Sequence, residues 1–301
     1  MRLLQLIELY FYVCEIYDEE LQWHCMRLTK NNALPAFTDQ ELLTSYLFSV
    51  AFERKLRIKD AHQYIYHHWL DCFPQLPSYT AYNARLNRLV SVFPLLVQRL
   101  VDRCPISTAP DVPISLTDSM PIITCSGKRQ GKVARELCDK GYNATKKMHF
   151  FGLKLHGIGF ACPGTLPAIE YLQLSAASEH DLAAQRSILE TFRQRVIVAD
   201  KAFCDATLEV HLQRQESELI TPVKYRKGQS EEDKQRHKAA DDLFSKAVSG
   251  IKQPIESLFS WILEHTDLQR ASKVRSTKGL LVHVFGKIAA ALIVKAQICS
   301  I

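Results

Sequence analysis

RVIVADKAF, residues 195–203, places four apolar residues directly before an aspartate, Asp200. An uninterrupted apolar run of this kind is typical of a buried strand with both faces covered, as in a parallel sheet. Asp200 then lies where the strand ends. It is either a turn or helix-capping residue, which is a common use of aspartate, or one carboxylate of a metal site on a rigid sheet. The choice depends on whether it has partners.

Four more strands are predicted around this one. The first three along the chain are joined by tight Gly and Pro turns and form an antiparallel meander. A helix then leads into RVIVADKAF, so that strand is expected to run parallel to the first. The elements are ISLTDS (114–119), HFFGLKLHGIGF (149–160), LPAIEYLQLSAA (166–177), the helix SEHDLAAQRSILETFRQR (178–195) and the last strand ELITPVKY (218–225). This order is that of a ribonuclease-H-like α/β fold with a mixed five-stranded sheet and flanking helices.

Residues 1–104 have a helical pattern instead. Thr38 and Glu41 form a capping box that opens one helix, and SYTAYNARLNRLVSVFPLLVQRLVDRC (78–104) follows a Pro-bounded loop. Its polar, aromatic and basic front resembles helix-turn-helix construction, although an exposed helix face has the same pattern. The candidate DNA contacts there are Tyr79, Asn83, Arg85 and Arg88.

The Pro-rich segment 105–112 separates two predicted domains. An all-α domain covers 1–104, and the ribonuclease-H-like domain covers 113–301. The apolar C-terminal segment 279–298 is interrupted by His283 and Lys287, so we expect a buried helix and no membrane partner.

Composition places the chain among ordinary globular proteins. It has 301 residues, 47% hydrophobic and 23% charged, with a formal net charge of +6. That excess suits a polyanionic partner, although a slightly basic surface without a partner is equally compatible with it. None of the nine cysteines forms a C-x-x-C pair, which argues against a zinc ribbon or a disulfide framework and favours free thiols in a cytoplasmic protein.

Asp118 is the partner that the predicted topology gives to Asp200. The first and fourth strands of such a sheet are neighbours, and Asp118 ends the first as Asp200 ends the fourth. Two adjacent carboxylates repel each other unless a cation lies between them. Mg²⁺ meets that need and prefers carboxylate oxygen.

Glu256 is the candidate for a third carboxylate. It lies in KQPIESLFSWILEH (252–265), where Pro254 suits a first helical turn and apolar residues repeat at helical spacing. Glu256 borders that apolar stripe, so it can point along the sheet edge toward the two aspartates. A glutamate in a first turn is also a common helix-dipole residue.

At this point the sequence resembles a known family. LTDSMPI around Asp118, FFGLKLHGI, SEHD, VIVADKAF around Asp200 and IESLFSWI with a later KVRSTKGL look like an Asp-Asp-Glu (DDE) transposase of a bacterial insertion sequence. The spacing of 56 residues from Asp200 to Glu256 matches the compact type, which has no large insertion domain.

The resemblance implies a catalytic domain over 113–301 in which Asp118, Asp200 and Glu256 bind two Mg²⁺ or Mn²⁺ ions. Water would first nick the ends of the element, and the freed 3′-OH would then attack target DNA. The implied partners are terminal inverted repeats and target DNA, bound by a homodimer or a larger assembly. The implied location is the bacterial cytoplasm, at the nucleoid when DNA is bound.

The residues around Glu256 depart from related families, which have Tyr, Arg and Lys seven before, four before and seven after the glutamate. This chain has Ser249, Lys252 and Leu263 at those positions. Lys252 keeps the positive charge and is a candidate DNA contact. His180 and Asp181 open the helix after the third strand, and they are either capping residues or supports of the metal ligands.

A basic stretch, 127–147, lies between the first two predicted strands. We expect it to leave the sheet beside Asp118 and to contact DNA phosphates, while a solvated loop is the simpler interpretation. Its candidate contacts are Lys128, Arg129, Lys132, Arg135, Lys146 and Lys147.

Two other functions remain open. An inactive or domesticated transposase would bind DNA without cutting it, and loss of an acid would favour that alternative. A nuclease of the same fold would cut DNA, and specific binding to one DNA end would argue against it.

Overall fold

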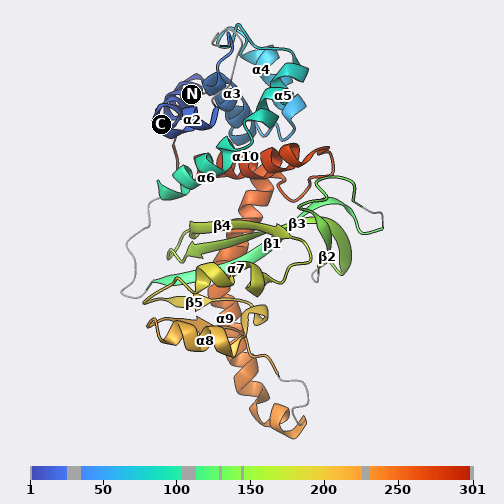
Figure 1. The fold of residues 1–301 in the computed structure, drawn as a ribbon. Helices are drawn as coiled ribbons and strands as arrows, with labels where there is room; N and C mark the ends of the chain where they lie inside the picture. Colours follow the sequence, from blue (N-terminus) through green and yellow to red (C-terminus); the bar gives the residue numbers. More distant parts are fainter. Residues whose placement is uncertain are drawn as a thin grey trace. The chain divides into compact units, whose positions relative to one another are not determined.

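The structure is a computed structural model that describes residues 2–25, 35–103, 113–128, 131–143, 146–225 and 231–298. The chain divides into two compact units, one of Met1–Cys104 with Ile262–Ile301 and one of Pro105–Trp261. Figure 1 shows the mixed sheet of the second unit and the helices of the first.

The sheet of Pro105–Trp261 confirms the expected ribonuclease-H-like order. Its strands are β1 (Ile114–Ser126), β2 (Asp139–Asn143), β3 (Met148–Phe160), β4 (Ala168–Ala176), β5 (Val196–Val198) and β6 (Glu218–Ile220). They are ordered β2-β3-β1-β5-β6, and β4 pairs with β3. The first four strands pair antiparallel, whereas β5 and β6 run parallel to β1. The sixth strand is β2, which lies within the segment that we expected to be a connection.

One face of the sheet is covered by two short helices, α7 (Asp181–Leu189) and α8 (Ala206–Gln213). Ile158 and Ile197 pack there with Leu182, Leu189 and Leu208 in a buried apolar cluster. Each such side chain contributes roughly 1.5–3 kcal/mol when it is fully buried. The predicted apolar run of β5 is therefore explained by its place in this core.

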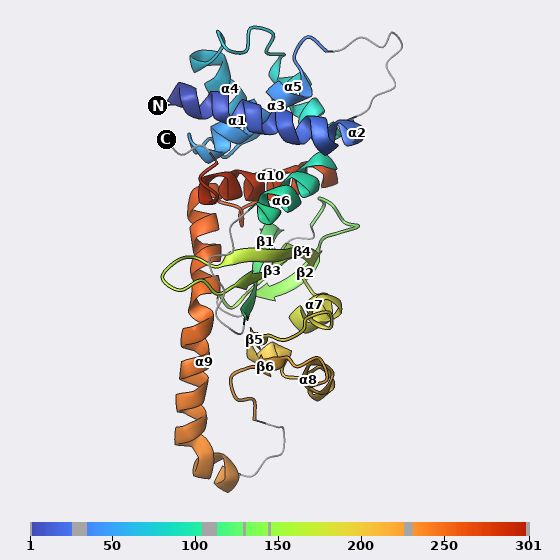
Figure 2. The ribbon, with the colours of Figure 1, turned by 90° about the vertical axis from the view of Figure 1, so that its left-hand side faces the viewer.

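The opposite face is covered by α9 (Glu231–Thr266), as Figure 2 shows. Two strand glycines allow the close approach, because a Cβ at Gly157 would lie 2.8 Å from Cζ of Phe259 and one at Gly159 would lie 3.4 Å from Cδ1 of Ile255. Pro254 is inside this helix, so the expectation that it belongs to a first turn is wrong. The helix begins at Glu231, well before Pro254.

The first unit consists of helices. They are α1 (Arg2–Ile16), a π-helical turn (Tyr17–Leu21), α2 (Gln22–Cys25), α3 (Asp39–Ala51), α4 (Ile58–His68), α5 (Tyr79–Arg88), α6 (Val92–Asp102) and α10 (Thr277–Lys295). The predicted capping box is present, with Thr38 and Glu41 exchanging hydrogen bonds at the start of α3. Ten residues separate α4 from α5, more than the three or four of a helix-turn-helix turn.

The C-terminal helix α10 packs on α3 and α6. It is long and apolar enough to cross a membrane, yet 61% of its most apolar 18-residue stretch is buried inside the structure. Nε2 of His283 donates to the Leu268 carbonyl (2.9 Å), and Nζ of Lys287 donates to the Asp267 carbonyl (3.3 Å). The compact units therefore differ from the expected division at the C-terminus, because Ile262–Ile301 belongs with the N-terminal helices.

Candidate active site

Two aspartates are brought together by the parallel pairing of β1 and β5. Leu116 pairs with Val198, and Asp118 and Asp200 each follow two residues later on their own strand. Asp118 lies inside β1 opposite Gly157 of β3, while Asp200 lies just past the end of β5. Residues two apart along a strand share a face, so this register directs both carboxylates to the same side of the sheet.

The third acid comes from α9. Lys252 and Glu256 are four residues apart, which places both on one face of the helix. Ile255, Leu258 and Phe259 are buried, and the contacts of Ile255 and Phe259 with strand glycines fix this helix against β3. That packing places Lys252 and Glu256 near Asp118.

A single ammonium contacts all three acids. Nζ of Lys252 lies 3.1 Å from Oδ1 of Asp118, 2.9 Å from Oδ1 of Asp200 and 3.3 Å from Oε1 of Glu256. The Lys252 side chain is only 5% exposed, whereas those of Asp200 and Glu256 are 53% and 55% exposed. The acids thus form an open cluster with a buried cation at its centre.

The electrostatics of the cluster follow from this arrangement. Burial raises the pKa of the Asp118 carboxyl to about 6, although the Lys252 ammonium and the Ser119 backbone N–H act against that rise. For Lys252, burial tends to lower the pKa, but Asp118 and Asp200 outweigh it and raise the pKa to about 12. Lys252 therefore stays charged at neutral pH.

The donor set suits a hard divalent cation. Three carboxylates converge on one point that a cation already occupies, and carboxylate oxygens are the preferred ligands of Mg²⁺ and Mn²⁺. In the described part of the chain, no three His, Cys, Asp or Glu side chains are arranged as a ready metal site. The oxygens lie about 3 Å from Nζ, which is ammonium distance, whereas Mg²⁺ requires about 2.0–2.1 Å.

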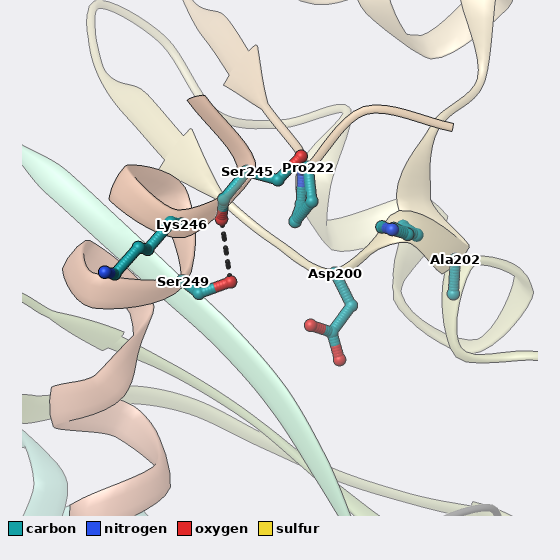
Figure 3. Close-up of a pocket in the computed structure, with 7 residues that line it drawn as sticks. Asp200, Ala202, Pro222, Ser245, Lys246 and Ser249 are labelled. Atoms are coloured by element: carbon teal, nitrogen blue, oxygen red, sulfur yellow. Dashed lines mark hydrogen bonds between the residues drawn. The ribbon is translucent and has the colours of Figure 1, made fainter. Parts of the chain in front are cut away.

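An open hollow of about 620 Å³ adjoins Asp200. Figure 3 shows the α9 residues Ser245, Lys246 and Ser249 on one side, with Pro222 beside Ser245, and Asp200 and Ala202 on the other side. Ser249 donates a hydrogen bond of 2.8 Å to the Ser245 carbonyl. Space for a substrate therefore exists beside the exposed aspartate. Ser249 is at the position where the resemblance led us to expect a tyrosine.

His180 and Asp181 lie on the other side of the sheet from the acids. Asp181 accepts a hydrogen bond from Nζ of Lys154 at 3.0 Å. Lys154 and Gly157 are three residues apart on β3 and so lie on opposite faces; Gly157 faces α9, whereas Lys154 faces α7. His180 is the exposed N-cap residue of α7 and makes no side-chain cap. The expectation that these two residues support the metal ligands is therefore not upheld by their position.

A buried polar network behind β1 was not predicted from the sequence. Thr117, next to Asp118, donates 2.6 Å to Oε1 of Gln185. Gln185 contacts Nδ1 of His156 at 3.3 Å, and Nε2 of His156 contacts Oγ of Ser175 at 2.8 Å. These residues fix the strand that bears Asp118 from behind. The one sequence signal for this network is that its strand residues, Thr117, His156 and Ser175, alternate with apolar residues along their strands.

The N-terminal candidates differ in accessibility. Arg85 is buried, with its guanidinium 2.8 Å from Asp39, so it does not present donors to bases and is withdrawn as a DNA contact. Tyr79 and Arg88 are exposed on α5, and Asn83 is partly buried. Lys252, also expected to contact DNA, instead faces the acids.

The basic stretch leaves the sheet elsewhere than expected. β1 continues for eight residues beyond Asp118, to Ser126, and pairs with β3 along that length. At about 3.3 Å per residue, Ser126 lies roughly 26 Å along the strand from Asp118 and the stretch starts after it, so the expectation that the stretch lies beside this acid is wrong. Arg129 lies outside the described residues; the exposed members are Lys128, Lys132, Arg135, Lys146 and Lys147.

Comparison with known proteins gives one result. The family described as Transposase DDE domain matches residues 110–293 of this chain. The matched segment contains all three acids and extends past the sheet-bearing unit into α10. No curated protein and no solved structure matches the chain.

Proposed function

The chain belongs to the transposase DDE-domain family, and on that premise we propose that it nicks the ends of a mobile DNA element and joins the freed 3′-OH to target DNA. Asp118, Asp200 and Glu256 are proposed as the catalytic acids. The supporting observation is that a single cation, Nζ of Lys252, contacts one oxygen of each.

Members of this family generally use divalent metal ions. Bound Mg²⁺ or Mn²⁺, in a pair, supplies activation of the attacking oxygen and stabilisation of the leaving 3′ oxygen. Asp118 is the most enclosed of the three acids, and together with Asp200 and Glu256 it would hold the ions. Asp200 and Glu256 are half exposed, and Asp200 also lines the adjoining hollow, so a phosphate bound there would lie beside Asp200.

The rest of the chain is proposed to bind the DNA. Phosphate contacts are assigned to Lys128, Lys132, Arg135, Lys146 and Lys147, with Arg129 retained from the sequence. A separation of roughly 26 Å corresponds to about eight base pairs of B-DNA at 3.4 Å each. These cations would therefore contact DNA well away from the phosphate being cut. Tyr79, Asn83 and Arg88 on α5 are proposed to read the terminal repeat.

The proposed assembly is a homodimer or larger on paired element ends, in the bacterial cytoplasm. A DNA-binding protein without activity is the weaker alternative, because all three acids are present and converge. A nuclease of the same fold would cut DNA without preference for particular ends.

The proposed function is tested with the DNA that flanks this gene. The whole chain, with Mg²⁺, should bind that DNA in preference to random DNA and nick it at the element ends. A mixture with target plasmid should then give joined products. Binding without nicking would support the inactive alternative, and nicking without end preference would support the nuclease.

A further inference from the structure

Lys252 has an environment unlike that of a DNA-contacting lysine. Its ammonium is buried and its three nearest charged partners are the proposed metal ligands, at 2.9–3.3 Å. A lysine that contacts phosphate extends into solvent on a flexible stem. This side chain instead has the position of a counter-ion.

The charges of the cluster require a cation there. Three carboxylates have a charge of −3, and Lys252 reduces the total to −2. Without it, three like charges would lie around one partly buried point, which disfavours their ionised form. The lysine thus keeps the site charged and assembled before any metal arrives.

A metal ion and the ammonium exclude each other from this point. Carboxylate oxygens must approach Mg²⁺ to about 2.0–2.1 Å, but here they surround Nζ at about 3 Å. Two cations at such distances repel strongly in a partly buried site. Metal binding to these oxygens therefore requires Nζ to move away.

We propose that Lys252 is the resident counter-ion of the acid cluster, and that a divalent cation must displace its ammonium to load the site. Lys252 thereby weakens metal binding to the protein alone and sets the concentration of divalent cation at which the site is filled. This inference rests on the proposed function, because it takes the three acids to be the metal ligands.

The hollow beside Asp200 offers a route for the displaced side chain. Ser249 lines it and lies three residues before Lys252, on the same face of α9. Nζ already lies 2.9 Å from Asp200, which forms the other side of the hollow. A small rotation of the lysine stem would move the ammonium from the acids toward a phosphate bound there.

The test measures Mn²⁺ binding without DNA, by calorimetric titration and by the rise in melting temperature. The proteins are the whole parent chain, Lys252→Met, Lys252→Gln and Asp118→Asn. Methionine removes the charge at similar length, while glutamine also keeps a hydrogen-bond donor if the methionine variant folds poorly. Lys238→Met is the matched control, since Lys238 is exposed on α9 about four turns from the acids.

Both neutral variants should bind Mn²⁺ roughly tenfold or more tightly than the parent. Without metal, their melting temperatures should be lower than that of the parent. Addition of Mn²⁺ should raise their melting temperatures by more than it raises that of the parent. A Lys252 variant that folds only when Mn²⁺ is present would also support the inference, because metal would then supply the charge that the lysine supplies in the parent. Lys238→Met should match the parent, and Asp118→Asn should lose most Mn²⁺ binding.

Equal Mn²⁺ affinity of the parent and both Lys252 variants, with binding lost in Asp118→Asn, would overturn the inference and leave the proposed function intact. Weaker binding in the neutral variants would overturn it too. Absence of Mn²⁺ binding from every protein, Lys252 variants included, would overturn both the inference and the metal-dependent function.

Discussion

Asp118 and Asp200 lie two residues beyond the same pair of hydrogen-bonded strand positions and contact the same ammonium, at 3.1 and 2.9 Å. The parallel register of β1 and β5 is thus what joins two acids that are distant in the sequence.

Activity should depend on the kind of divalent cation. We expect nicking of element-end DNA with Mg²⁺ or Mn²⁺, and binding without nicking in Ca²⁺, whose longer and looser coordination poorly supports in-line displacement. A gel assay of cleaved and bound DNA measures both. Full nicking in EDTA would exclude the metal-dependent mechanism.

Stability should fall as the pH is lowered from about 6.5 toward 4. Burial lowers the pKa of His156 to about 4, with Asp181 opposing this and Lys154 adding to it. Because the folded pKa is below the unfolded value, the unfolded chain binds the proton more readily across this window. The loss at pH 5 relative to pH 7 should be about 2 kcal/mol from this residue.

Urea unfolding of the parent and His156→Gln at both pH values measures this contribution. The glutamine variant should be less stable at pH 7, because the contacts to Ser175 and Gln185 change, but should lose less on acidification. His283, whose pKa burial lowers to about 3, is present in both proteins and cancels in the comparison. An unchanged pH dependence in the variant would contradict the assignment.

The basic stretch should bind DNA without reading its sequence. Lys132→Ala with Arg135→Ala is expected to weaken binding to terminal and random DNA by similar factors. The salt dependence should become shallower by roughly one unit of slope per cation removed. Arg193→Ala is the control, since Arg193 is exposed before β5, at the opposite end of that strand from Asp200. Loss of terminal-repeat binding alone would indicate base contacts instead.

Variants of α5 should separate recognition from stability. Arg88→Ala is expected to reduce the preference for terminal repeats by about 1–3 kcal/mol with little effect on folding. Arg85→Ala should instead destabilise the fold by about 3–5 kcal/mol, because it breaks a buried ion pair by removing the guanidinium that lies 2.8 Å from Asp39. Deleting residues 1–110 is a poor test, since α10 packs on α3 and α6 and would be uncovered. If Arg88→Ala keeps the parental preference, recognition lies elsewhere.

Period-two and period-3.6 patterns predicted the sheet order and the pairing of β1 with β5, because strand identity and crossover direction depend on local sequence. They did not predict that β1 runs on to Ser126 or that Pro254 lies within a 36-residue helix. Both depend on pairing and packing with distant residues: β3 supports the extension of β1, and the strand glycines admit α9.

The candidate acids could be picked out from the sequence because a carboxylate after a strand-like run is conspicuous. The expectation that Asp118 ends its strand is wrong, however, since β1 continues past it to Ser126. The role of Lys252 was not, since a lysine four residues from a glutamate is usually an exposed helix pair. Arg85 was misjudged for the same reason: a basic residue among polar neighbours gives no sign in the sequence that Asp39, across the helical unit, buries and neutralises it.

The most direct test of the central claim is the rate of nicking of element-end DNA in Mg²⁺ by Glu256→Gln and by Glu264→Gln. Both glutamates are exposed on α9, but only Glu256 contacts the ammonium shared with the aspartates. Glu256→Gln should lose at least about a thousandfold in rate, as should Asp118→Asn and Asp200→Asn, with DNA binding retained. Glu264→Gln should keep the parental rate. Near-parental nicking by Glu256→Gln would contradict the account.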